Sequence, residues 1–245
     1  MIIRTINKVR SLASFLFFAM GFIVAQELQA DSIHIDRNIN PFKLYPKGID
    51  FEVKRNEEII GFHRVNFEPS TSNGISVVAE MNIKVSFLGF PLYKYSYFSA
   101  AQWQGGYLQN LVAKQNDDGD KSEVNIRRNN KKLSITGPNG DTFGAIKLLP
   151  SNHWNFRILE MNKVIDTIKG QVADIEIENK GVERIKVKGG AVSATKYVFG
   201  GDVDAIVWYH RTGRWVKLLF RAEDNSIIEL LCKECGVSEF IIAGN

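Results

Sequence analysis

The chain has few of the residues that most often carry catalysis or bind metals. It contains two cysteines and four histidines in 245 residues, and the histidines lie far apart, at His34, His63, His153 and His210. No G-x-S-x-G, H-E-x-x-H, phosphate-binding-loop or dinucleotide-binding pattern occurs. We therefore expect neither a metal centre nor a cofactor, and we favour a binding protein over an enzyme.

The chain also lacks a strong charge of either sign. It carries 31 Lys and Arg against 27 Asp and Glu, a formal net charge of +4. Three of the basic residues and one acidic residue lie in the first thirty positions, which leaves 28 − 26 = +2 for the remainder. This balance argues against nucleic acid as a partner. Hydrophobic residues make up 44% of the chain, which is enough to form a packed core.

The first thirty residues have the layout of an export signal. Arg4, Lys8 and Arg10 form a basic start, and the apolar stretch Leu12–Ala25 follows. That stretch is shorter than a membrane-spanning helix. We predict that residues 1–30 are a cleaved signal peptide, and that the mature protein is periplasmic or secreted and has no stable transmembrane span. An uncleaved membrane anchor is the alternative.

The remainder of the chain, residues 31–245, reads as a series of short strands. About fourteen runs rich in β-branched and aromatic residues follow one another, with Gly, Asn, Asp and Pro between them. The last of these runs is Val237–Ile242. Helical crossovers are absent. The pattern predicts a single all-β domain, folded as a strongly curved antiparallel sheet in the form of an open barrel or half-barrel.

One segment, Ser151–Asn162, is the interior helix candidate. Trp154, Ile158, Met161 and Ile165 recur along it at the spacing of one helical face. We expect a short helix here that lies against the concave side of the sheet.

The most regular part of the chain is a group of three strands near its end. They are expected at Val203–Tyr209, Trp215–Phe220 and Ile227–Leu231. A three-residue loop would place Tyr209 opposite Trp215 and Trp208 opposite Val216. A four-residue loop would place Trp208 opposite Trp215 instead. Either register gives a cross-strand aromatic cluster, typically worth roughly 0.2–1 kcal/mol per pair.

The two cysteines, Cys232 and Cys235, form a single C-x-x-C pair that follows a strand. Export would permit a disulfide between them. We favour a small structural disulfide or two inert thiols. A redox dithiol and half of a zinc site are the alternatives.

Aromatic side chains are the most plentiful candidates for a binding site. If the curved sheet encloses a cavity for an apolar ligand, six of them are candidates to line it: Trp103, Tyr107, Trp154, Trp208, Tyr209 and Trp215. The alternative is that these side chains simply fill the core.

Several short motifs occur in an order that is found in a family of exported bacterial proteins. They are Phe51–Val53, Ile60–His63, Tyr93–Tyr97, Gln102-Trp103, Gly106-Tyr107-Leu108, His153-Trp154-Asn155, Trp208-Tyr209 and Gly213-Arg214-Trp215-Val216. On these residues the chain resembles the domain-of-unknown-function family of the 6134 type. The resemblance implies an exported curved-sheet protein, related by fold analogy to lipoprotein-carrier half-barrels. Gln102 and His210 depart from acidic residues that are common in that family.

Three functional hypotheses follow. The first is a non-enzymatic binding or carrier protein for an apolar or lipidic ligand or for an envelope protein, and it predicts a cavity lined by Trp and Tyr. The second is an envelope structural or assembly factor with a protein partner, and it predicts the same side chains close-packed together with an exposed apolar patch or a free sheet edge. The third and least favoured is an enzyme, which predicts a cleft with titratable groups of shifted pKa.

Overall fold

The computed structural model describes residues 39–70, 73–187, 190–222 and 224–233. The expected signal peptide, the expected last strand Val237–Ile242 and Cys235 lie outside the described residues. No helix in the described part is both long enough and apolar enough to cross a membrane.

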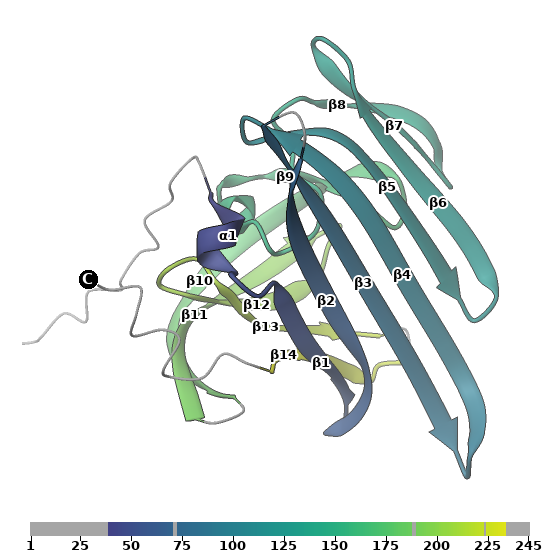
Figure 1. Cartoon of the computed structure of the whole chain (residues 1–245). Helices are drawn as coiled ribbons and strands as arrows, with labels where there is room; N and C mark the ends of the chain where they lie inside the picture. The colour runs from purple at the N-terminus through teal and green to yellow at the C-terminus, as the bar shows by residue number, and fades with distance from the viewer. Residues whose placement is uncertain (1–38, 71–72, 188–189, 223, 234–245) are drawn as a thin grey trace, which may run out of the picture.

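The described residues form one antiparallel sheet of fourteen strands, which curls around a single core (Figure 1). The strands are β1 Ile49–Arg55, β2 Glu58–Ser70, β3 Gly74–Phe87, β4 Phe90–Gln104, β5 Tyr107–Asp117, β6 Asp120–Arg128, β7 Lys132–Gly137, β8 Gly140–Ala145, β9 Lys163–Asp166, β10 Gln171–Val187, β11 Gly190–Gly201, β12 Ala205–His210, β13 Trp215–Arg221 and β14 Ile227–Cys232. Their order across the sheet is β8-β7-β6-β5-β4-β3-β2-β1-β14-β13-β12-β11-β10-β9. Every neighbour in this order follows in sequence except at the β1–β14 junction.

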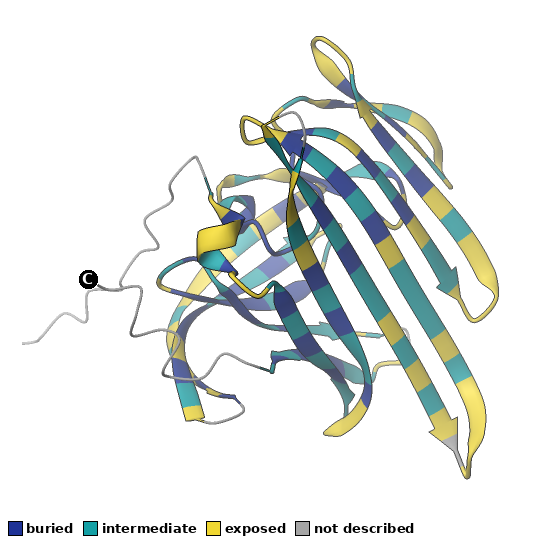
Figure 2. Ribbon diagram, in the orientation of Figure 1, coloured by how far each residue is buried: buried dark blue, intermediate teal, exposed yellow. Residues whose placement is uncertain are grey.

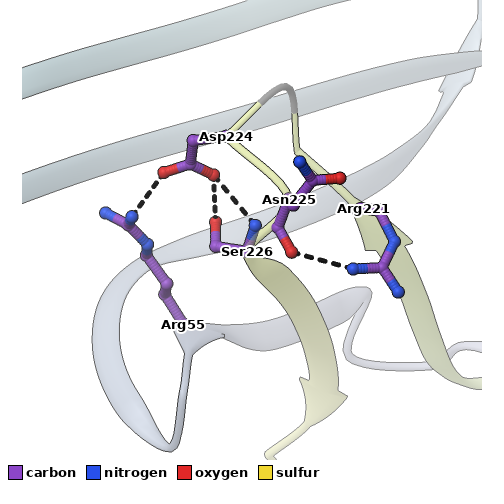
Figure 3. A network of polar contacts seen from close by, with 5 residues as sticks. All are labelled: Arg55, Arg221, Asp224, Asn225 and Ser226. Atoms are coloured by element: carbon purple, nitrogen blue, oxygen red, sulfur yellow. Dashed lines mark hydrogen bonds and ion pairs between the residues drawn. The ribbon is translucent and has the colours of Figure 1, made fainter.

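The β1–β14 junction joins the two halves of the chain. Phe51 pairs with Cys232, and the ladder runs on to Arg55 opposite Ile228. At its far end Arg55 forms an ion pair with Asp224 of the β13–β14 turn (Figure 3). Asp224 also accepts hydrogen bonds from the Ser226 backbone N–H (3.0 Å) and hydroxyl (2.6 Å), which holds the turn closed. In the same turn Arg221 donates to the Asn225 carbonyl at 2.9 Å.

The two ends of the sheet come together without a ladder between them. A Cβ on Gly137, the last residue of β7, would lie 2.7 Å from the Cα of Gly170, which immediately precedes β10. The Asn139 side chain also donates to the Gln171 side chain at 3.0 Å. The molecule is therefore a nearly closed barrel with one seam, as the expectation of an open barrel required.

Burial alternates along the strands, because successive side chains point to opposite faces of the sheet (Figure 2). In β5, for example, Leu108, Leu111 and Ala113 are buried while Asn110 and Lys114 are exposed. The buried side chains of all the strands form one hydrophobic core inside the barrel.

The expected interior helix is shorter than its sequence pattern suggested. Only Phe156–Glu160 is helical, as a single 3₁₀ turn (η1) in which Asn155 is the N-cap. The chain then continues directly into β9. The apolar spacing arose because this segment faces the barrel interior, and Trp154 and Ile158 are buried as predicted. A second helix, α1 Pro41–Leu44, was not expected; Asn40 caps it by accepting a hydrogen bond from the Lys43 N–H at 3.2 Å.

One other expectation differs from the structure in register. Tyr209 pairs with Trp215 as predicted, but a bulge places Trp208 opposite Lys217 rather than Val216. A single strand, β10, runs from Gln171 to Val187 through the turn-type residues Asn179-Lys180-Gly181, and its pairing with β11 has an irregularity between Asn179 and Val182.

Candidate functional site

The interior of the barrel is occupied by residues 150–167, which we call the closing segment. Its two ends are tied together, because the Ser151 N–H donates to the Ile165 carbonyl and the Ile165 N–H donates to the Leu149 carbonyl, both at 2.8 Å. Between these ends Trp154, Phe156 and Ile158 are each at most 4% exposed. The segment is therefore part of the hydrophobic core rather than a surface loop.

Two buried tyrosines, Tyr45 and Tyr209, hold consecutive carbonyl groups of the closing segment. The Tyr209 hydroxyl donates to the His153 carbonyl at 3.0 Å. The Tyr45 hydroxyl donates to the Trp154 carbonyl at 3.0 Å and accepts from the Trp215 N–H at 3.0 Å. Burial raises the pKa of both hydroxyls, so both stay protonated and able to donate.

The aromatic rings of the interior contact one another in two groups. In the first, Trp154 lies edge-on to Trp103 and Phe67, with ring centroids 5.4 and 5.3 Å apart, and Phe67 stacks on Tyr45 at 5.5 Å. These separations are typical of directly packed aromatic pairs. The rings therefore fill the space that a ligand in this part of the barrel would need.

The second group surrounds Trp215 of β13. Phe51 lies edge-on to the Trp215 ring, with centroids 4.5 Å apart. The imidazoles of His63 and His153 each lie 5.6 Å from it, and His153 also contacts Phe199 at 5.4 Å. The two histidines are thus enclosed by aromatic rings from β1, β11 and β13.

Both interior histidines are neutral at physiological pH. Burial lowers the pKa of His63 to about 4, although a hydrogen bond to the Glu80 backbone acts in the opposite direction. Burial lowers the pKa of His153 to about 3, and the nearby His63 adds to the shift. The Nδ1 atoms of both rings lack a hydrogen-bond partner among the described residues. A neutral, enclosed imidazole suits packing better than proton transfer with a solvent-exposed substrate.

A small hollow at the rim of the barrel lies over the first aromatic group. It measures about 170 Å³ and is lined by Ile75, Trp103, Trp154, Asn155 and the glycines of the β4–β5 turn, among others. The indole N–H groups of Trp103 and Trp154 are buried without an acceptor among the described residues. Two unpaired donors next to a hollow are the interior groups best suited to bind an acceptor oxygen.

A second hollow lies on the outer face of the sheet, across β3, β4, β5 and β6. This outer groove measures about 470 Å³ and contains Phe98, which is 44% exposed. Charged side chains surround the ring, including Glu80 and the ion pair between Lys114 and Glu123 (3.4 Å). An apolar ring set among charges of both signs is suited to contact with a polar partner surface.

The six predicted cavity residues do not all come together. Trp103, Trp154, Tyr209 and Trp215 meet in the interior, in contact with the closing segment or part of it. Tyr107 lies at the rim, 43% exposed, with the Arg128 guanidinium 5.0 Å from its ring. Whether the interior residues line a ligand site remains a prediction.

Trp208 lies on the outer face. Its strand position alternates with the inward Val207 and Tyr209, and it pairs across the sheet with Lys196 and Lys217. Both ammonium groups lie over its ring, at 5.5 and 5.1 Å. Its indole N–H donates to Glu183 at 2.8 Å, and this hydrogen bond is the main cause of the lowered pKa of that carboxyl group. Lysine side chains, rather than the barrel interior, therefore bury this ring.

Sequence reasoning missed several residues that hold the interior together. The hydrogen-bond partners of Tyr45 are 109 and 170 positions away, so no local pattern identified it. His63 could have been found, because it alternates with the buried Val65 along β2 and so faces inward.

Among the described residues, no group of three or more His, Cys, Asp or Glu is placed to hold a metal ion. Cys232 is buried at the end of β14, and its bond to Cys235 remains a prediction.

Comparisons with known proteins agree with this architecture. A crystal structure described as a β-barrel-like protein of domain of unknown function DUF1849 from Brucella abortus matches with a TM-score of 0.53 at 8% identity, over 76% of this chain and 94% of that chain. At this identity the likeness concerns the fold alone. A search of curated proteins found no match. The sequence profile of the domain of unknown function DUF6134 matches residues 51–233, which span β1 to the end of β14. The chain therefore belongs to the DUF6134 family.

Proposed function

We propose that this protein is a binding scaffold of the bacterial cell envelope, with a filled interior and a protein partner that contacts its outer surface. The observation that carries the proposal is the closing segment, which is packed between Trp103 and Trp215 and anchored by Tyr45 and Tyr209. The export-type N-terminus supports an envelope location. The outer groove around Phe98 is the surface that we assign to the partner.

The packing favours this scaffold over a carrier. A carrier for an apolar ligand needs an enclosed site, and such sites typically measure roughly 300–1,000 Å³. The aromatic rings of this interior instead contact each other at centroid distances of 4.5–5.6 Å. A ligand would have to displace the closing segment, and with it the two hydrogen bonds that buried tyrosine hydroxyls donate to it.

A carrier role is the second candidate, because of the hollow at the rim. The unpaired indole N–H groups of Trp103 and Trp154 would suit a carboxylate or carbonyl oxygen of an apolar ligand. In that case the closing segment would act as a lid, and the ligand would enter between it and the β4–β5 turn.

Native mass spectrometry can separate the two candidates. The mature protein would be purified from the periplasm without detergent, and its organic extract would be analysed. The scaffold predicts the mass of the chain alone in repeated preparations. A stoichiometric apolar adduct that is lost in the Trp154→Phe variant, which removes the indole N–H, would favour the carrier. The Trp208→Phe variant is the matched control, because Trp208 lies on the outer face.

Partner contact can be tested with a photo-crosslinking amino acid at position 98. The proposal predicts a discrete crosslinked protein from the envelope of the native host, which is lost when Lys114 and Glu123 are both exchanged for residues of opposite charge. The same crosslinker at the exposed Phe143 of β8 serves as the control. Equal crosslinking from both positions would contradict an assignment to the outer groove.

A further inference from the structure

The hairpin between β3 and β4 extends beyond its neighbouring strands. The ladder with β2 ends at Ile83, and the ladder with β5 ends at Tyr95. Just past it, the Lys94 carbonyl accepts from the Asp118 N–H at 2.8 Å. From Val85 and Tyr93 outward, the two strands pair only with each other. This projection, residues 85–93, is the tip hairpin, and it forms the lowest point of the molecule in Figure 1.

The tip hairpin is the most exposed apolar part of the described molecule. Leu88 is 83% exposed, Phe90 is 73% exposed and Leu92 is 63% exposed. Ile59, which is 58% exposed, lies next to the β1–β2 turn at the same end of the barrel. An exposed group of large apolar side chains on a soluble protein marks a surface that contacts something apolar.

The turn of this hairpin is unusual in its residue type. Leu88 has φ 49° and Gly89 has φ 83°, so both central residues adopt the left-handed conformation. Asn-Gly or Asp-Gly normally occupies such a turn. The other five non-glycine residues with positive φ in the described part are Asn, Asp or Glu: Asn56, Glu57, Asn73, Asp118 and Asn225. Leu88 therefore departs from the residue types that favour this turn and an exposed position.

Residues at the base of the tip hairpin match those found at a membrane surface. Lys84 and Lys94 lie directly opposite each other and are both exposed, and Tyr93 and Tyr95 follow on the other face. Tyrosine is enriched at membrane–water interfaces, and lysine extends its ammonium group from apolar surroundings into water. Lys84 and Leu88 are four positions apart, a length of about 13 Å in a strand. That length exceeds the roughly 5–10 Å to which interfacial segments penetrate a bilayer.

We infer that the tip hairpin is a membrane-docking element that inserts Leu88, Phe90 and Leu92 into the surface of a lipid bilayer. A projecting, convex tip needs no matching pocket, which suits a fluid apolar layer better than a folded protein. This inference goes beyond the proposed scaffold function and does not rest on it, because the outer groove and the tip hairpin are separate surfaces.

The charges on the neighbouring turns indicate whether lipid binding depends on anionic lipid. Glu57 and Glu58 lie at the β1–β2 turn, and Asp117, Asp118 and Asp120 lie at the β5–β6 turn. These acidic residues offset the two lysines. Binding is therefore driven by apolar insertion, and it depends little on anionic lipid or on salt.

The test is co-sedimentation of the purified mature protein with phosphatidylcholine vesicles. We expect the natural chain to bind and the variant Leu88→Asn/Phe90→Ser to lose at least tenfold in partition coefficient. Phe143→Ser is the matched control, because Phe143 is 58% exposed on β8, away from the tip hairpin, and it should bind like the natural chain. Equal thermal midpoints for the three proteins would show that the barrel stays folded.

Three outcomes would overturn the inference. One is failure of the natural chain to bind phosphatidylcholine vesicles. Another is binding that the double substitution leaves unchanged. The third is self-association in analytical ultracentrifugation that disappears with the double substitution while vesicle binding is absent, which would assign the tip hairpin to a second copy of the chain. None of these outcomes bears on the mass-spectrometric test of the filled interior.

Discussion

The barrel interior and the tip hairpin use the same kinds of side chain in opposite ways. In the interior, Trp154 and Trp215 are each 4% exposed or less and pack ring against ring. In the tip hairpin, Leu88 and Phe90 are more than 70% exposed. Burying a large apolar side chain stabilises a fold by about 1.5–3 kcal/mol, and the tip hairpin forgoes that gain. The difference follows from position, because the barrel surrounds the interior side chains, whereas the two strands of the tip hairpin pair only with each other.

The largest effect on stability should come from Trp154→Ala. Removing this ring leaves a cavity between Trp103 and Phe67, and we expect a loss of about 3–5 kcal/mol in the free energy of unfolding. Urea denaturation measures the loss. Phe90→Ala is the control from the tip hairpin, with an expected change within about 0.5 kcal/mol. Similar losses of stability in the two variants would contradict the difference between the barrel interior and the tip hairpin.

The second-largest loss in the free energy of unfolding should come from lowering the pH. His63 and His153 are neutral in the folded protein, with pKa values of about 4 and about 3, whereas unfolded histidine titrates near 6.5. Below pH 6.5 the unfolded chain therefore binds protons that the folded chain does not, so stability falls as pH falls toward these values. At pH 5 the loss is about 2 kcal/mol for each histidine.

Urea midpoints at pH 7 and pH 5 measure this loss. Above pH 6.5 the two histidines add no pH dependence. A midpoint that stays constant from pH 7 to pH 5 would mean that the two rings are accessible to protons in the folded protein, and hence that the interior opens.

A smaller effect is expected from removing the tyrosine anchors. Tyr45→Phe leaves the Trp154 carbonyl and the Trp215 N–H without their partner, and we expect a loss of about 1–3 kcal/mol. Tyr209→Phe removes one hydrogen bond, to the His153 carbonyl, and should cost about 1 kcal/mol. Denaturation of the two variants side by side checks the order. A larger loss for Tyr209→Phe would contradict the double role of the Tyr45 hydroxyl.

The smallest change in stability is expected at the tip hairpin. Leu88→Asn places a residue that tolerates positive φ at the turn and removes an exposed apolar side chain. We expect an unchanged or slightly higher unfolding free energy, within about 0.5 kcal/mol. Thermal denaturation of the variant measures it. A loss above 1 kcal/mol would show that Leu88 contributes to the fold.

The sequence predicted the sheet well because period-two burial and turn residues are local signals. The pairing of Tyr209 with Trp215 followed from the length of one loop. The partner of Trp208 did not, because the register shifts between Trp208 and Tyr209, which leaves Val216 of β13 unpaired and places Trp208 opposite Lys217. Trp208 and Tyr209 are consecutive in β12 and point to opposite faces of the sheet, and no local pattern identified which of the two faces inward.

The interior site could not be derived from sequence because its contacts join distant parts of the chain. The closing segment has helical spacing, yet the barrel around it leaves room for only one 3₁₀ turn. Its contact with the β12–β13 turn shows how tight this fit is, since a Cβ on Gly213 would lie 2.3 Å from the Phe156 ring. Packing of this kind depends on the closed barrel, which no local pattern encodes.

Hydrogen–deuterium exchange of the mature protein tests the central claim most directly, namely that residues 150–167 are a fixed part of the core. The account predicts that peptides covering the closing segment exchange as slowly as those of β1 and β13, while peptides covering residues 85–93 exchange orders of magnitude faster. Exchange of residues 150–167 at the rate of the tip hairpin would contradict the account. That result would make the closing segment a lid and the barrel a carrier.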